Sequence, residues 1–186
     1  MKYKKKTIVI ALGGNALIRE GQRGTIEEQF ENTRKSLDSV IYCLKQGMEV
    51  VITHGNGPQV GNELLRVEAA RGIVPELPLG VCVADTEGAM GYMIQQSLVN
   101  RLRKEGLQKC VVTLLTQVIV DRHDPAFHNP TKPVGPFYTK EQAERFIKER
   151  GWNMVEDSKR GYRRVVPSPM PLEIVEKESV RRLLDA

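Results

Sequence analysis

The stretch Thr7–Asn15, TIVIALGGN, gives the strongest indication of the fold. Its apolar part is short, continuous and rich in β-branched side chains, and Gly13-Gly14 closes it. Such a run is typical of a strand that is buried on both faces, as in a parallel sheet. We therefore predict a buried strand over Thr7–Leu12 that ends in a glycine turn.

A second run of the same kind, EVVIT at Glu49–Thr53, leads into a longer glycine-rich turn, HGNGPQVG at His54–Gly61. Between the two runs, Thr25 and Glu28 have the spacing of a capping box, which predicts the start of a helix. Gly47 is at a plausible C′ position, just after the predicted end of that helix. The order strand, helix, strand favours parallel pairing of the two strands.

The same alternation continues along the chain. We predict helices over Gln59–Arg71 and Cys82–Lys104, and a third buried strand over Lys109–Thr116, KCVVTLLT. Alternating strands and helices predict an α/β fold in which a mostly parallel sheet lies between helices, as a three-layer sandwich.

The character of the sequence changes near Asp121. Between Asp121 and Pro136 the sequence has four prolines and shows no apolar periodicity. A short helix from Thr139 to about Arg150 and a hairpin of Trp152–Val155 with Tyr162–Val166 follow. We predict an α/β core over residues 1–120 and a small protruding lid subdomain over residues 121–166. Residues 167–186 form a return segment and a helix over Glu173–Asp185, with its apolar residues pointing inward.

Length and composition exclude several classes of protein. The chain has 186 residues, of which 40% are hydrophobic, and contains no apolar run near the roughly 20 residues that cross a membrane. The net charge of +5 comes largely from an N-terminal tail with Lys2, Lys4, Lys5 and Lys6. A solvated tail explains this charge better than a nucleic-acid surface does, so we expect neither nucleic acid nor membrane as a partner.

The three cysteines, Cys43, Cys82 and Cys110, are scattered and form no CxxC pair. This pattern is typical of buried, reduced thiols in a cytoplasmic protein.

The two glycine-rich turns are the best candidates for a binding site. Glycine lets a ligand approach the backbone closely, and the N–H groups exposed at such a turn and at the following helix attract anions. Neither turn has the spacing of a Walker A loop or of a dinucleotide fingerprint. A site for a small anion at the carboxyl ends of the strands is therefore predicted.

Four stretches together resemble the carbamate kinases, within the amino acid kinase fold family. They are IVIALGGNAL at Ile8–Leu17, THGNGPQVG at Thr53–Gly61, GVCVADTEGAMGYMIQQSL at Gly80–Leu98 and NPTKPVGPFY at Asn129–Tyr138. They occur in the same order as in that family, and the match covers essentially the whole chain. The resemblance implies reversible phosphoryl transfer between ATP and carbamate, which gives ADP and carbamoyl phosphate. It also implies Mg²⁺ with ATP, a cytoplasmic homodimer and a setting in arginine metabolism. We expect no metal held by the protein.

The resemblance also implies roles for individual residues. Related kinases have a lysine two residues before the first Gly-Gly, where this chain has Ala11. Carbamate kinases share that alanine and bring a lysine from the protruding subdomain, which matches Lys132. Gly13 and Gly14 would present N–H groups to the transferred phosphoryl group. Carbamate would be held by the second turn, through Gly55, Asn56 and Gly57, with Asn15 as a weaker candidate.

Each candidate also has a simpler interpretation. Asn15 and Asn56 have the residue type of ordinary turn asparagines, and Lys132 that of a solvated loop lysine. His54 is better interpreted as a packed, hydrogen-bonded histidine than as a base, because an anionic acceptor needs none. A further group of metal-ligand residue types has no zinc-motif spacing and is interpreted as a mobile polar loop: Asp121, His123, Asp124 and His128.

Members of the family are considerably longer than this chain. Their second half supplies the nucleotide loop, so we expect that the nucleotide-binding half is absent here and that the isolated chain is inactive. Two alternatives stay open: another amino acid kinase, acting on an acylated amino acid or a nucleotide, and a truncated, non-catalytic binding chain. The sequence does not decide whether the chain is a truncated gene product or a fragment.

Overall fold

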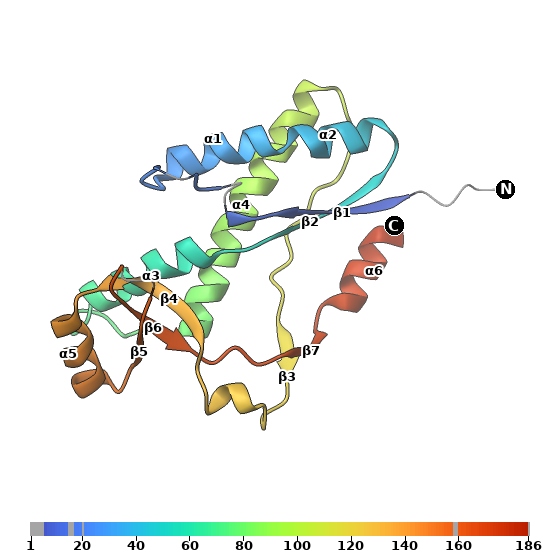
Figure 1. The fold of residues 1–186 in the computed structure, drawn as a ribbon. Helices are drawn as coiled ribbons and strands as arrows, with labels where there is room; N and C mark the ends of the chain where they lie inside the picture. The colour runs from blue at the N-terminus through green and yellow to red at the C-terminus, as the bar shows by residue number, and fades with distance from the viewer. Residues whose placement is uncertain (1–5, 15–16, 20, 158–159, 186) are drawn as a thin grey trace. The chain divides into compact units, whose positions relative to one another are not determined.

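The structure is a computed structural model that describes residues 6–14, 17–19, 21–157 and 160–185. The chain divides into two compact units (Figure 1). The first unit comprises Met1–Asn56 and Ala84–Leu115, and the second comprises Gly57–Val83 and Thr116–Ala186. The described helices and strands, in chain order, are β1 (Thr7–Leu12), α1 (Ile26–Ser36), α2 (Asp38–Lys45), β2 (Glu49–His54), α3 (Gly57–Ala69), α4 (Leu79–Lys104), β3 (Val118–Val120), the 3₁₀ helix η2 (Pro125–Phe127), β4 (Lys132–Tyr138), α5 (Lys140–Arg150), β5 (Asn153–Glu156), β6 (Tyr162–Val166), β7 (Pro171–Ile174) and α6 (Lys177–Asp185).

A parallel pair of strands forms the centre of the first unit. β1 and β2 pair in register from Thr7↔Glu49 to Leu12↔His54. Helices α2 and α4 pack on one face of the pair and bury an aliphatic core, with α1 and α2 running alongside the strands (Figure 1). This core consists of Leu37, Val40, Ile41, Leu98 and Leu102, against which Ile10, Val50 and Ile52 pack. The predicted α/β class and parallel pairing are therefore confirmed.

Burial of β1 on both faces is not observed. The exposure of its residues alternates along the strand, and the side chain of Val9 is 63% exposed on the face opposite Ile10. Successive side chains of a strand point to opposite faces, so helices on one face leave every second residue open. In the described residues the first unit is a two-layer arrangement of helices on a sheet.

The predicted helix boundaries of the first unit hold where capping residues define them. Thr25 and Glu28 form the expected capping box at the start of α1. Gly47 follows α2 with a φ of 74°, a left-handed conformation that favours glycine. One feature was not predicted: Leu37 is the C-cap of α1 and the N-cap of α2, so the expected single helix is two.

The prediction of a third strand over Lys109–Thr116 is wrong, since this segment contains no regular secondary structure. Side chains and helix groups hold it instead. The Gln95 amide donates to the Val111 carbonyl, and the Thr113 hydroxyl donates to the Gly91 carbonyl. A β-strand requires backbone partners on a neighbouring strand, and apolar β-branched residues alone do not supply them.

An antiparallel sheet of order β4-β6-β5 forms the larger sheet of the second unit. The predicted hairpin corresponds to β5 and β6, and the helix predicted after Thr139 is α5, which has a capping box with Gln142. Strand β4 was not predicted, because Pro133 and Pro136 indicated an irregular segment. It lies at the sheet edge, where proline is tolerated.

Helix α3 packs against β4 within the second unit. The contact is close because two glycines meet: a Cβ atom on Gly61 would lie 3.5 Å from the Cα of Gly135. A Cβ atom at Gly61 would thus reach van der Waals contact with the strand, whereas Gly135 favours glycine through its φ of 78°. This packing joins the helix that follows the second glycine turn to the strand that begins at Lys132.

The C-terminal part of the second unit differs from its prediction. β7 pairs antiparallel with β3, which the sequence did not indicate. Four of the five apolar residues expected to point inward are exposed, with values of 48% for Ile174, 50% for Val175, 48% for Leu183 and 37% for Leu184, whereas Val180 is half-buried. Helix α6 has no buried residue among those described, because no described element covers its apolar side.

Candidate functional site

The two glycine turns leave the same edge of the sheet. Leu12 and His54 are register partners at the ends of β1 and β2. Gly13 and Gly55 follow these partners directly, so both turns start from adjacent positions at the carboxyl ends of parallel strands. Ligands of open parallel sheets bind at this edge.

The first turn leaves its backbone accessible. Gly13 and Gly14 are exposed, and no heavy atom lies within 4 Å of the position that a Cβ atom would occupy on either residue. The Gly14 carbonyl accepts hydrogen bonds from the N–H groups of Leu17 and Ile18, at 3.1 and 2.9 Å. The carbonyl is thus used within the turn, while the glycine surface stays open to a ligand.

The second turn leads directly into a helix. Gly55 and Asn56 connect β2 to Gly57, the first residue of α3. The first turn of α3 contains no acidic residue that would neutralise the positive end of the helix dipole. N–H groups in the first turn of a helix favour an anion.

A hydrogen bond orients the Asn56 side chain. Its amide nitrogen donates to Oγ1 of Thr86 on α4 at 3.0 Å, and Thr86 is only 6% exposed. Sequence analysis did not single out Thr86, since a threonine inside a helix gives no signal of such a role. An asparagine held in this way presents its amide in one orientation instead of rotating freely.

His54 differs from its prediction. Its Nδ1 atom is buried and has no hydrogen-bond partner among the described residues. The hydrogen bond expected of a packed histidine is therefore not observed at this atom.

The structure places Lys132 at the first position of β4, paired with Val166 of β6 and exposed to solvent. Because β4 packs on α3, Lys132 and Gly57 begin two elements of the second unit that contact one another. Gly13, Gly14, Gly55 and Asn56 belong to the first unit. Asn15 lies outside the described residues.

The acidic residues of the proline-rich segment stabilise turns. Asp121 accepts a hydrogen bond from the His123 N–H at 2.8 Å. Asp124 accepts from the N–H groups of Ala126 and Met170, at 2.8 and 2.9 Å. These backbone hydrogen bonds lower the pKa of Asp124. Within the described ranges no group of three or more His, Cys, Asp or Glu side chains is arranged to hold a metal ion.

Among the described residues, no helix is both long enough and apolar enough to cross a membrane.

The paired turns and the parallel strands define an α/β protein with two glycine turns at one edge of its sheet, and comparisons with known proteins narrow this class. No protein-family model matches the chain. A carbamate kinase from Pyrococcus furiosus is 54% identical over 182 residues, which cover 97% of this chain and 58% of that protein. A carbamate kinase from Trichomonas vaginalis is 51% identical over 180 residues, covering 96% of this chain and 57% of that protein.

Solved structures agree with the sequence relatives. The structure of carbamate kinase from Giardia lamblia bound to AMP-PNP aligns with a TM-score of 0.88 at 44% identity, over 97% of this chain and 58% of that one. This chain is homologous to the N-terminal part of carbamate kinases. The family resemblance predicted from the four sequence stretches is confirmed, and the chain spans less than three fifths of the relatives it matches.

Proposed function

We propose that these 186 residues form the acceptor side of a carbamate kinase, which transfers a phosphoryl group reversibly between ATP and carbamate. The observation that supports this most is the common edge of the two glycine turns, fixed by the register of Leu12 with His54. The identity with carbamate kinases extends through both turns and the Lys132 segment, since the matches cover 97% of the chain. Another amino acid kinase is less favoured, because Ala11 stands where related kinases have a lysine.

In the proposed reaction, a carbamate oxygen attacks the γ-phosphorus of ATP, and the bond from that phosphorus to the ADP oxygen breaks. Such a step needs positioning and charge neutralisation more than covalent catalysis. The N–H groups of Gly13 and Gly14 would donate to the phosphoryl oxygens as negative charge builds up on them. Lys132 would supply a mobile positive charge at the same oxygens.

Carbamate has a carboxylate and an amino group, so its site needs both donors and acceptors. The N–H groups at Gly55 and Gly57 would bind the carboxylate. The Asn56 side chain offers a donor and an acceptor, and its hydrogen bond to Thr86 would fix its direction. No general base is needed, because the attacking oxygen is already anionic.

ATP would bring Mg²⁺ with it, since this ion is usually held by substrate phosphates, water and one or two carboxylates. The ion neutralises phosphate charge when bound. The protein would act as a homodimer in the cytoplasm, and residues 121–166 would form a lid.

Further helices would cover the open face of the sheet on which Val9 lies and would complete a three-layer sandwich. The high exposure of Val9 supports this part of the proposal.

A chimera tests the proposal. The 186 residues are joined to the rest of the Pyrococcus furiosus relative, roughly two fifths of that protein. ATP formation from ADP and carbamoyl phosphate is then measured with a coupled assay. We expect turnover with carbamoyl phosphate as the phosphoryl donor to ADP, and none above background with phosphorylated acyl amino acids or with nucleoside diphosphates other than ADP as donors. A folded chimera that prefers one of those donors would favour the rival amino acid kinase activity.

The isolated chain is the matched control for this assay. We expect it to show no turnover but to bind carbamoyl phosphate, because the acceptor side is intact. A chain that neither binds carbamoyl phosphate nor gains activity in the folded chimera would contradict the proposed function.

A further inference from the structure

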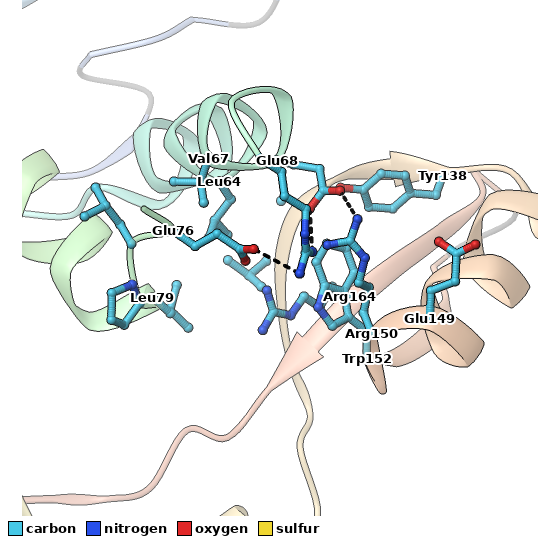
Figure 2. Close-up of a pocket in the computed structure, with 15 residues that line it drawn as sticks. Leu64, Val67, Glu68, Glu76, Leu79, Tyr138, Glu149, Arg150, Trp152 and Arg164 are labelled. Atoms are coloured by element: carbon cyan, nitrogen blue, oxygen red, sulfur yellow. Dashed lines mark hydrogen bonds and ion pairs between the residues drawn. The ribbon is translucent and has the colours of Figure 1, made fainter. Parts of the chain in front are cut away.

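The second unit contains a cavity of about 380 Å³ that the proposed reaction does not use. It lies between α3, the loop that leads to α4, and the β4-β6 part of the sheet (Figure 2). None of the residues predicted for phosphoryl transfer lines it. Its volume falls within the range of small-molecule sites.

Most charged groups in this cavity are already paired. Glu68 on α3 forms an ion pair with Arg150 at 2.6 Å, as Figure 2 shows. Arg71 contacts Glu76 at 2.9 Å and Glu68 at 3.8 Å. These ion pairs connect α3 with α5 and with the loop that leads to α4, and both arginines in them have a carboxylate partner.

Arg164 is the exception among the arginines that line the cavity. Its guanidinium stacks on the Trp152 ring, 4.5 Å from the ring centroid. The Arg164 side chain has neither a hydrogen bond nor an ion pair within the part of the chain that the structure describes, although its backbone pairs with β4 and β5. Burial lowers its pKa, although Tyr138 and Glu68 act in the opposite direction. A partly buried guanidinium without a carboxylate partner has unused hydrogen-bonding capacity.

A second unpartnered group lies in the same cluster. The Nη1 atom of Arg150 is buried and has no hydrogen-bond partner among the described residues. The side chain of Arg150 is only 16% exposed, and its other terminal nitrogen is the one that binds Glu68. The cavity therefore has donor capacity at two arginines that no described protein acceptor satisfies.

Guanidinium groups bind carboxylates and phosphates through two parallel N–H donors, and stacking on an aromatic ring fixes the plane of that fork. Aliphatic side chains also line the cavity, and Figure 2 shows Leu64, Val67 and Leu79 on the side away from Trp152; Leu77 is a further aliphatic lining residue. We propose that this cavity binds a small organic anion, whose carboxylate or phosphate group contacts Arg164 and whose apolar part faces these aliphatic side chains. Such a ligand would contact α3 and the β4-β6 sheet together, and would stabilise the packing of α3 on β4.

The position of Trp152 allows a direct test, because it is the only tryptophan in the sequence and lines the cavity. The 186-residue chain is titrated with succinate and, separately, with inorganic phosphate, while sodium chloride keeps the ionic strength constant. We expect a saturable change in tryptophan emission with at least one anion, and the two titrations tell which group is preferred. No saturable change with either anion would overturn the proposal.

Two arginine variants decide whether Arg164 binds the anion. Losing a charge-assisted contact should weaken binding about tenfold or more in Arg164→Met. Arg145→Met is the matched control. Arg145 also stacks on an aromatic ring, that of Phe146, but its side chain is 58% exposed and does not line the cavity. Arg145→Met should keep the parent affinity. Equal affinity of the parent and Arg164→Met would mean that Arg164 only stabilises the subdomain, and the proposal would fail.

A variant that is expected to bind the anion more tightly keeps the test decisive even if Arg164→Met does not fold. Glu76→Gln removes one carboxylate partner of Arg71 and should tighten anion binding about threefold, the effect expected for a partly exposed ion pair. Unfolding cannot produce tighter binding. Should Arg164→Met unfold in circular dichroism, Glu76→Gln decides alone, and an unchanged or weaker affinity in it would overturn the proposal.

Discussion

Lys132 is the residue whose proposed role is most open to a direct test. Phosphoryl transfer needs a cation near the moving oxygens, and Ala11 leaves the first turn without one. In the chimera with the rest of a carbamate kinase, we expect Lys132→Ala to lower kcat on the order of 10²–10³-fold, with a much smaller rise in KM for carbamate. A contact made mainly in the transition state appears in kcat. Steady-state kinetics at varied carbamate concentration measures both constants.

Two further variants separate chemistry from charge alone. Lys132→Arg should recover only part of kcat, because a planar fork replaces a compact ammonium group. Lys140→Ala changes another exposed lysine of the same subdomain and should leave both constants unchanged. A kcat for Lys132→Ala within about threefold of the parent, or roughly 0.7 kcal/mol, would identify Lys132 as an ordinary solvated lysine.

Gly91 makes a second prediction at the level of single residues. A Cβ atom there would lie 2.2 Å from Cγ2 of Thr113 and 3.2 Å from its Cβ. Because threonine is stiff at χ1, Gly91→Ala should destabilise the protein by about 1–3 kcal/mol. Adding Thr113→Ala should recover most of that loss by removing the closest atom. Urea unfolding of the single and double variants measures the coupling, and additive effects would contradict it.

A carboxylate that joins two helices makes the fold sensitive to acid. Glu105 accepts hydrogen bonds from Lys45 of α2 at 2.7 Å and from Arg101 of α4 at 2.8 Å. The Lys45 and Arg101 hydrogen bonds lower the pKa of Glu105 from 4.5 to about 2. A lowered carboxylate pKa stabilises the folded state above the unfolded pKa, and this stability is lost as pH falls through the folded pKa. We therefore expect the Glu105 contribution to decrease between about pH 4.5 and pH 2.

Urea unfolding midpoints at pH 6 and pH 3 measure this effect. Glu105→Gln should lower stability at pH 6 and should reduce the fall in stability between the two pH values. Glu144→Gln, at an exposed position of α5, is the control and should leave the difference near that of the parent. An identical fall in the parent and in Glu105→Gln would contradict the assignment.

Elements with local signals could be predicted, and elements that depend on distant partners could not. Thr25 and Thr139 fix helix starts through capping boxes, which involve only neighbouring residues. The Lys109–Thr116 segment has strand composition but lacks strand pairing. β4 and β7 are strands because distant segments supply their hydrogen bonds, and their prolines conceal this in the sequence.

In the candidate site too, residues with local sequence signals could be predicted, and residues that depend on distant contacts could not. The glycine turns were identified because each combines a strand end with unusual local residues, and the register of β1 with β2 brings both to one edge. Thr86 was missed because its contact with Asn56 joins residues far apart in the sequence. The Arg164 cavity was missed for the same reason, since its lining residues extend from Leu64 to Arg164.

The predicted lid should differ from the central strands in mobility. Residues Asp121–Pro136 contain four prolines and few buried side chains, whereas Glu49–Thr53 lies in the parallel pair. Few buried contacts favour local opening. We expect amide hydrogens of Asp121–Pro136 to exchange faster in hydrogen–deuterium exchange followed by mass spectrometry. Equal protection of the two segments would contradict a mobile lid.

Nucleotide affinity is the property of the whole molecule that most directly tests the proposed division of labour. The 186 residues span 58% of the Pyrococcus furiosus relative, and no glycine follows Gly161 in them. The described residues after that point form β6, β7 and α6, without a glycine turn at a strand end. Loops that hold nucleotide phosphates usually need such glycines, because the backbone must approach the phosphates closely. Isothermal titration of the isolated chain with Mg-ATP should therefore show no saturable binding at millimolar concentration, while carbamoyl phosphate should bind. Micromolar affinity for ATP would mean that the nucleotide site lies within these residues, and the assignment of this chain to the acceptor side would be wrong.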